Sequence, residues 1–202
     1  MTFSEVAPAD LGAAELYSVL TRSVVPRPIA FVSSVSASGV RNLAPFSYFM
    51  LGGGAPPSLA FSPVARAGVE SKDTLSNIEA TGEYTVNLVT REIVSSMNLT
   101  AAEFGSDVDE WEISGLEPAL TSFVKPAFVA LSPVGFACKL FQVVRHGDLP
   151  GAARYVIGEV VGLRLRSDVL GGAGVDTVAR LGGAGYLDTA VPEVFELVRP
   201  KA

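Results

Sequence analysis

The sequence predicts a mainly β domain with a few short helices. Glycine (20 residues) and proline (13 residues) are distributed along the whole chain, which indicates many turns between short strands. Segments of strand character do not alternate regularly with helical ones, so a doubly wound parallel sheet is not expected. The length of 202 residues fits a single domain, which we place over 1–202.

The predicted strands are rich in β-branched and apolar residues. The first ends before Gly39, which belongs to a turn sequence, and the stretch 84–89 alternates as a strand with one core face does. Pro133 divides a long apolar stretch into two buried strands. The full set of predicted strands is 29–36, 57–62, 84–89, 128–131, 134–144 and 154–165.

Two helices are expected, over residues 72–81 and 91–102. The first opens with Lys72-Asp73-Thr74 and ends at Gly82, the residue type favoured just past a helix C-terminus. The second places its apolar residues on one side, which is typical of a helix that covers a core.

Composition excludes several classes of function. The net charge is −6 and the pI is about 4.8, so the basic surface of a nucleic-acid-binding protein is missing. One cysteine and one histidine rule out the common structural zinc sites and an internal disulfide, and we predict no metal site. No secretory signal and no apolar stretch of about 20 residues is found, so we expect no membrane segment. The missing signal and the lone cysteine favour the cytoplasm.

No arrangement of catalytic side chains is recognisable. The glycine motifs of nucleotide-binding loops are missing, and we interpret the glycines at 52–54 and 171–172 as turns. His146 lies in a turn-like stretch and is interpreted as a solvated loop histidine. Cys138 lies in an apolar run and is interpreted as a buried, inert thiol; Lys139 beside it would lower the thiol pKa only if both were exposed. We therefore predict no catalytic residue.

The most informative stretch is 42–49, with sequence NLAPFSYF. It combines a proline, a hydroxyl and three aromatic rings in eight positions, more polar groups than a core strand needs. A flat heteroaromatic ligand would use them, because apolar walls hold its faces and polar groups meet its edge. The helix start at Lys72-Asp73-Thr74 suits a phosphate, since helix N-termini present free N–H groups. On the helix alone, an ordinary capped helix with a solvated lysine is the favoured interpretation.

An ordered set of short motifs resembles the flavin reductase-like family, which includes the flavoredoxin-type proteins. The resemblance covers roughly residues 17–200. The motifs in chain order are PRPIAFVSSV at 26–35, NLAPFSYF at 42–49, FS at 61–62, KDT at 72–74, TGEY at 81–84, and RLGG at 180–183 followed by Tyr186.

The resemblance implies an FMN-binding split barrel of six Greek-key strands, a homodimer, and one FMN per subunit near the dimer interface. It implies that the flavin lies along 31–35 and 42–47, with Ser47, Ser62, Lys72 and Thr74 near the phosphate and ribityl chain. The residues expected to bind the cofactor are Arg27, Ser33, Ser34, Val35, Asn42, Ala44, Pro45, Phe46, Ser47, Ser62, Lys72, Asp73 and Thr74.

Two assignments stay open within this resemblance. For Arg27, a phosphate contact and a surface position between flanking prolines are equally open. For Arg180 and Tyr186, the alternatives are an approach to the flavin and a plain turn, and the plain turn is the favoured interpretation. Met50 and the glycines at 52–54 depart from the family pattern, and they concern the open face of the flavin rather than the phosphate contacts.

The function implied is an FMN-dependent oxidoreductase, with NADH or NADPH as the electron donor. Because the flavin carries the chemistry, this function needs no dedicated catalytic side chain. The alternative is a flavoredoxin-like electron carrier that exchanges electrons with a redox partner protein and has little reductase activity of its own. A strand-rich domain with an empty pocket would require the ordered motifs to be a coincidence.

Overall fold

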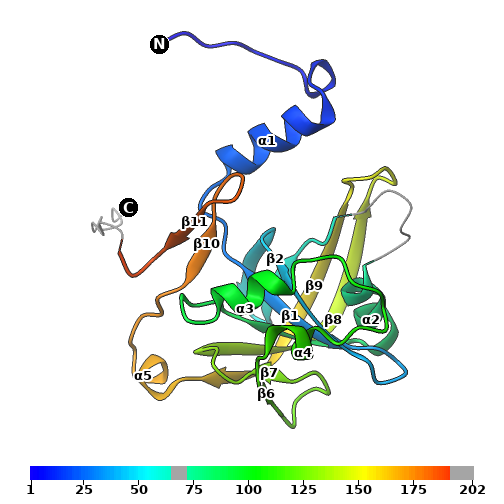
Figure 1. Cartoon of the computed structure of the whole chain (residues 1–202), viewed down its shortest axis with the longest axis vertical. Coiled ribbons are helices and arrows are strands. Elements are labelled where there is room, and N and C mark those ends of the chain that lie inside the picture. Colours follow the sequence, from blue (N-terminus) through cyan, green and yellow to red (C-terminus); the bar gives the residue numbers. More distant parts are fainter. Residues whose placement is uncertain (65–71, 192–202) are drawn as a thin grey trace.

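A computed structural model describes residues 1–64 and 72–191, and strands dominate it (Figure 1). Seven strands form one antiparallel sheet, which confirms the mainly β prediction; in the order in which they pair, they are β2 (Arg41–Phe46), β1 (Ala30–Val35), β5 (Glu83–Asn87), β8 (Val134–His146), β9 (Ala153–Leu165), β4 (Pro57–Phe61) and β3 (Phe49–Gly54). The sheet therefore has seven strands rather than the six expected. The expectation of one domain over 1–202 stays a prediction, and residues 192–200 of the family resemblance lie outside the described part.

The sheet closes on itself into a split barrel. Its two outer strands, β2 and β3, lie at opposite ends of the pairing order, yet only Ser47 and Tyr48 connect them. Three Cα–Cα steps span at most about 11 Å, so the two ends of the sheet must lie next to each other. Pairing of β1 with β5, and of β4 with β9, joins strands that are distant in sequence, as Greek-key connections do. We call the junction of β2 and β3, at Ser47 and Tyr48, the seam of the barrel.

Strand β1 is covered on both faces. Ala30 and Val32 pack into the cluster inside the barrel, which contains Tyr84, while Phe31 packs with Ile29 into a second cluster on the other face. Alternate residues of a strand point to opposite faces, so a strand with two covered faces is apolar throughout. This explains why residues 29–32 are all apolar rather than alternating.

The helices lie around the barrel, and one of them extends away from it. Helix α2 packs on β1 and β2, and α3 and α4 pack on β2. The N-terminal helix α1 extends away from the sheet (Figure 1). Among the described residues, no helix is both long and apolar enough to cross a bilayer. The helical segments are η1 (Pro8–Asp10), α1 (Ala13–Ser23), α2 (Asp73–Thr81), α3 (Val94–Leu99), α4 (Glu110–Ser114) and α5 (Ser167–Leu170).

Four short strands complete the structure. Two of them pair as β6 (Pro118–Ala119) with β7 (Phe128–Val129), and the other two as β10 (Val178–Arg180) with β11 (Tyr186–Asp188). The apolar stretch around Pro133 is indeed divided, with β7 before the proline and β8 after it. The helix expected over 91–102 is shorter than predicted, because only α3 keeps helical geometry and turns flank it.

One strand was not predicted in this region, and one interpretation was wrong. The stretch 42–46 belongs to β2, and Pro45 is tolerated there because β2 is an outer strand that needs no partner on its far side. Residues Gly52 to Gly54 lie in β3 rather than in a turn. A Cβ atom at Gly52 would come within 2.5 Å of the Ser58 hydroxyl, so the close approach of β4 favours glycine there. The glycines at 171–172 do form a turn.

Candidate functional site

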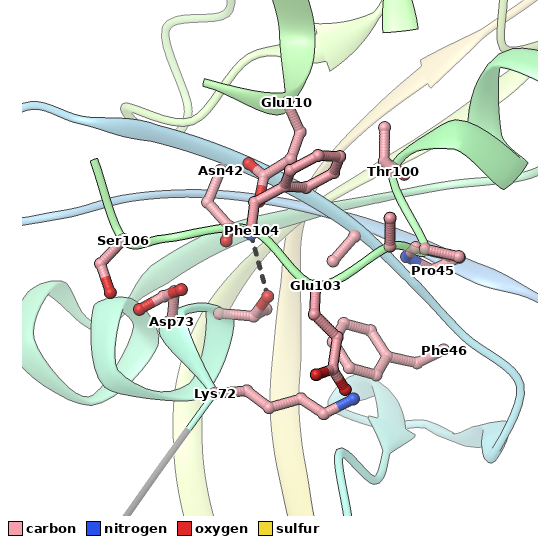
Figure 2. A pocket seen from close by; sticks show the side chains of 14 residues that line it. Asn42, Pro45, Phe46, Lys72, Asp73, Thr100, Glu103, Phe104, Ser106 and Glu110 are labelled. Atoms are coloured by element: carbon pink, nitrogen blue, oxygen red, sulfur yellow. Dashed lines mark hydrogen bonds between the residues drawn. The ribbon is translucent and has the colours of Figure 1, made fainter. Parts of the chain in front are cut away.

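A pocket of about 370 Å³ opens beside the barrel seam. Three segments build it: strand β2, the N-terminus of α2, and the stretch 100–110 that joins α3 to α4. Figure 2 shows Lys72 and Phe46 at one end of this pocket and Asn42 and Glu110 at the other. The volume lies within the range of about 300–1,000 Å³ that is usual for ligand sites.

The start of α2 presents groups that suit an anion. Lys72 is the N-cap residue, and its own side chain makes no capping hydrogen bond to the helix. The Lys72 ammonium lies 5.3 Å from the centre of the Phe46 ring, so the cation borders the aromatic wall of the pocket. The Asn42 side-chain amide donates a hydrogen bond of 2.9 Å to the Thr74 hydroxyl, which ties β2 to the helix (Figure 2). Thr74 therefore keeps its own hydroxyl proton to donate to a ligand.

The opposite end of the pocket holds a buried acid. Glu110 accepts a 3.1 Å hydrogen bond from the backbone N–H of Leu43, which fixes strand β2 against helix α4. Burial raises the pKa of the Glu110 carboxyl, and the nearby Asp73 and Asp109 carboxylates raise it further, against backbone hydrogen bonds that lower it. At the other end, the Glu103 carboxylate lies beside the Lys72 ammonium (Figure 2), so the pocket has one cation and carboxylates at both ends.

Most of the predicted cofactor residues meet at this seam. Those that line the main pocket are Asn42, Ala44, Pro45, Phe46, Lys72, Asp73 and Thr74. Ser47 and Ser62 line a neighbouring pocket of about 190 Å³, which shares Pro45, Phe46 and Lys72 with the main one. The clustering of these residues, which are distant in sequence, agrees with the motif-based prediction of their role in flavin binding. That role itself stays a prediction.

The remaining predicted residues lie away from the main pocket. Ser33 and Ser34 are buried in β1, where the Ser34 hydroxyl accepts a 3.2 Å hydrogen bond from Asn77. Val35 ends the same strand opposite Arg41. These three residues line neither the main pocket nor its neighbour, and their role in flavin binding stays a prediction.

Arg27 is buried, so the surface interpretation was wrong. Its guanidinium donates to the backbone carbonyl oxygens of Thr21, Val24 (2.9 Å) and Leu181 (3.0 Å). Its Nε also lies 3.5 Å from the Ser47 hydroxyl. Arg27 therefore joins the N-terminal helix, the C-terminal part and the seam of the barrel, and its proposed phosphate contact has not been tested.

The stretch 100–106 and Glu110 were not predicted as part of the site. They carry no motif and no periodic pattern, so the sequence gives no direct indication of them. The one local indication of a helix start was Asp109, a residue type favoured at the N-cap, which is followed by acidic residues. Asp109 does cap α4, because its carboxylate accepts a 3.0 Å hydrogen bond from the Trp111 N–H. Asp109 also pairs with Arg41, whose Nε lies 2.7 Å away, and this pair attaches the stretch to β2.

Arg180 and Tyr186 do not lie in a plain turn, contrary to the favoured interpretation. They face each other across the β10–β11 hairpin, and the Arg180 guanidinium lies 4.6 Å from the centre of the Tyr186 ring. Together they line a third pocket beside Pro45 and Phe46, of about 230 Å³.

The single cysteine and the single histidine line none of these pockets. Cys138 is buried, and burial raises the pKa of its thiol to about 12, which confirms the inert interpretation. His146 is exposed at the end of β8. Within residues 1–64 and 72–191, no group of His, Cys, Asp and Glu is arranged to hold a metal ion.

Comparisons with known proteins agree with this geometry. The family described as flavin reductase like domain matches residues 21–181. An uncharacterized protein of Deinococcus radiodurans is 38% identical over 195 residues, covering 91% of this chain and 84% of that protein. Nitrilotriacetate monooxygenase component B from Bacillus cereus is 30% identical with a TM-score of 0.89, covering 98% of this chain and 100% of that one. A proposed flavin reductase with a split barrel domain from Shewanella frigidimarina has a TM-score of 0.80 at 21% identity, covers 98% of this chain and 100% of that one, and shows likeness of fold.

Proposed function

The chain belongs to the flavin reductase-like family of flavin oxidoreductases, and from this premise we propose that it binds FMN and accepts hydride from NADH or NADPH. The observation that carries the proposal is the pocket at the barrel seam, where an aromatic strand and a helix N-terminus meet. FMN has a flat ring system at one end and a phosphate at the other. The pocket offers a matching element for each.

The donor set at the start of α2 fits a phosphate. The Lys72 ammonium, the Thr74 hydroxyl and the first N–H groups of the helix supply positive charge and hydrogen-bond donors within one turn. Asp73 in the same turn, Glu103 beside Lys72 and Glu110 at the far end disfavour a second anionic group. This pattern favours a ligand with one phosphate, FMN, over one with two.

Strand β2 provides the surface for the ring. Pro45 and Phe46 present apolar surface toward the pocket, and Ser47 follows them at the seam. When bound, FMN supplies the hydride and electron chemistry. The chain's own residues bind and orient it: Lys72 and Thr74 hold the phosphate, and Pro45 and Phe46 limit the ring to one orientation and exclude water from one face.

We also propose a homodimer in the cytoplasm. Helix α1 extends away from the barrel, and its residues Tyr17 and Leu20 are 62% and 54% exposed (Figure 1). On β3, Met50 and Leu51 are 59% and 71% exposed on an outer strand. Apolar surface of this kind on a helix and a sheet edge supports its burial against a second copy.

The test is an anaerobic titration of the FMN-loaded protein, followed by the visible flavin absorbance. We expect the absorbance to bleach when NADH or NADPH is added, with the preferred donor acting faster. If neither nucleotide bleaches the bound flavin, the protein is not a reductase but an electron carrier that takes electrons from a partner protein. Failure to bind any flavin would contradict the proposal altogether.

A further inference from the structure

The third pocket differs in chemistry from the main one. It lies between the seam, helix α3 and the β10–β11 hairpin, and its lining residues are Ile29, Pro45, Phe46, Ser47, Met97, Asn98, Ala101, Arg180 and Tyr186. Arg180 carries the only charge among these residues. The walls are largely apolar, and an amide and two hydroxyl groups complete the lining. Apolar walls with a few convergent polar groups are the usual form of a small-molecule site.

The cation in this pocket is held in a fixed position. The backbone of Arg180 exchanges two hydrogen bonds with Arg27, of 2.9 and 2.8 Å. Its guanidinium stacks on the Tyr186 ring and donates a 2.8 Å hydrogen bond to the Gly183 carbonyl. The Tyr186 hydroxyl in turn donates to the Asn98 side chain at 3.2 Å. Within the described residues, the guanidinium makes no further hydrogen bond, so donors remain for a ligand.

A second positive charge lies behind the wall of the pocket. The Arg27 guanidinium is 3.5 Å from the hydroxyl of Ser47, a lining residue. Its hydrogen bonds within the described residues otherwise go to neutral carbonyl oxygens, which do not cancel the charge. An anion in the pocket would therefore be attracted by both arginines. This local charge contrasts with the net charge of −6 of the whole chain.

We propose that this third pocket binds a planar organic carboxylate with a single ring. The carboxylate would meet the Arg180 guanidinium, which suits this anion better than a point charge does. The ring would lie against Ile29, Met97 and the aromatic residues. At about 230 Å³, the pocket is smaller than the usual range of about 300–1,000 Å³, so it fits one ring rather than a dinucleotide. The proposal goes beyond FMN binding and does not depend on it, because the pocket is formed by the chain alone.

The test uses nicotinate and nicotinamide, which share their ring and differ in the charge of one substituent. Dissociation constants are measured by ligand-detected NMR on the flavin-free protein and again on protein saturated with FMN. We expect nicotinate to bind at least about tenfold more tightly than nicotinamide, because only nicotinate carries the anion. We expect FMN to leave nicotinate binding in place, since the third pocket shares only Pro45, Phe46 and Ala101 with the main one and Arg180 lines the third pocket alone.

Substitutions assign the binding to the pocket. Arg180→Gln should weaken nicotinate binding by about ten- to a hundredfold, the range for losing a hydrogen bond to a charged group, and leave nicotinamide binding unchanged. Arg166→Gln, which removes an exposed arginine paired with Asp168, is the matched control and should have no effect. Asn98→Asp places a negative charge in the opposite wall and should also weaken nicotinate, which tests the pocket if Arg180→Gln fails to fold.

Three results would overturn the proposal. Equal or tighter binding of nicotinamide would make the pocket a site for neutral rings. Unchanged nicotinate affinity in Arg180→Gln or Asn98→Asp would place the anion elsewhere. Displacement of nicotinate by FMN would make the pocket a part of the flavin site. A protein that binds nicotinate as expected but no FMN would retain this proposal and contradict only the proposed flavin function.

Discussion

Lys72 is the residue on which the proposed phosphate site depends most. Replacing it by alanine removes the side-chain cation at the start of α2 and should weaken FMN binding by about 1.5–3 kcal/mol, the value of a hydrogen bond to a charged group. Fluorescence titration of FMN measures the change. Lys139→Ala is the control, because Lys139 is exposed on β8 and lines none of the pockets described above. Unchanged FMN affinity in Lys72→Ala would remove this residue from the phosphate site.

Glu110 should make stability depend on pH in the acidic range. Burial is the main cause of its raised pKa, so the folded state holds the proton more tightly than the unfolded state does. The free energy of unfolding should then fall as pH rises from the ordinary carboxyl pKa of 4.5 through the raised value.

The variant Glu110→Gln isolates this effect. Its amide oxygen can still accept from the Leu43 N–H, but it does not titrate. Urea unfolding at a series of pH values should show the variant gaining on the wild type as pH rises, with a constant difference above the raised pKa. A difference that does not change with pH would show that Glu110 has an ordinary pKa.

At the level of single residues, the sequence predicted which side chains gather but not all the reasons. Asn42, Phe46, Lys72 and Thr74 meet at one pocket, and their ordered motifs indicated this. Ser34 lies away from this pocket and accepts a hydrogen bond from Asn77, and its role in flavin binding stays a prediction. The stretch 100–106 entered the pocket without a motif, since its position depends on how α3 and α4 pack on β2.

Among the elements, β5 and β9 fit together through a tight contact inside the barrel. A Cβ atom at Gly158 would lie 1.9 Å from the Tyr84 hydroxyl oxygen. Apart from the Cys138 thiol, a weak partner, that hydroxyl has no hydrogen bond within the described residues. The Tyr84 side chain therefore lies so close to the backbone of residue 158 that only glycine fits there.

Two substitutions test this contact. Gly158→Ala should lower the free energy of unfolding by about 1–3 kcal/mol, the usual cost of overpacking. Tyr84→Phe should cost less than about 1 kcal/mol, because the lost hydroxyl has little to bond with. In the Tyr84→Phe background, Gly158→Ala should cost less than it does alone, as chemical denaturation will show.

The control for this pair is Gly54→Ala on β3, where an added Cβ meets nothing within 4 Å. Equal costs of Gly158→Ala and Gly54→Ala would show that the contact with Tyr84 is not what limits residue 158. Additive effects of Gly158→Ala and Tyr84→Phe would lead to the same conclusion.

The elements were predictable where the pattern was local. The long strands β8 and β9 and helix α2 lie close to the ranges expected from apolar runs and from Gly82. Helix α1 was not predicted, although its apolar residues do gather on one side of the helix. Strand β2 was missed because its proline and polar residues are unusual in a central strand, whereas β2 is an outer one.

For the molecule as a whole, closure of the barrel could not be deduced from local patterns. It depends on pairing of β4 with β9 across about 100 positions of sequence and on a two-residue connection at the seam. Only the family resemblance indicated a split barrel. The seam matters for function, because it brings together Phe46, Ser47 and Ser62, which belong to different strands and connections.

The exposed face of α1 leads to a prediction about assembly. Tyr17 and Leu20 lie three residues apart on this helix and are 62% and 54% exposed, and Val24, just past its end, is 63% exposed. Light scattering after size exclusion should give about twice the chain mass of 21.0 kDa for the wild type. Leu20→Glu should shift the protein toward the monomer, because it places a charge in the buried interface.

Leu170→Glu provides the comparison, since Leu170 is 76% exposed on the short helix α5. It should leave the mass unchanged. A wild type that is monomeric at all concentrations would contradict the dimer, and a Leu20→Glu variant that remains dimeric would place the interface away from α1.

The most direct test of the account is a crystal structure of the protein grown with FMN. The account predicts the phosphate at the start of α2, within hydrogen-bond distance of Lys72 and Thr74, and the ring against Pro45 and Phe46 at the barrel seam. FMN bound elsewhere, or a seam pocket that stays free of flavin at saturating FMN, would contradict the central claim that this pocket is the flavin site.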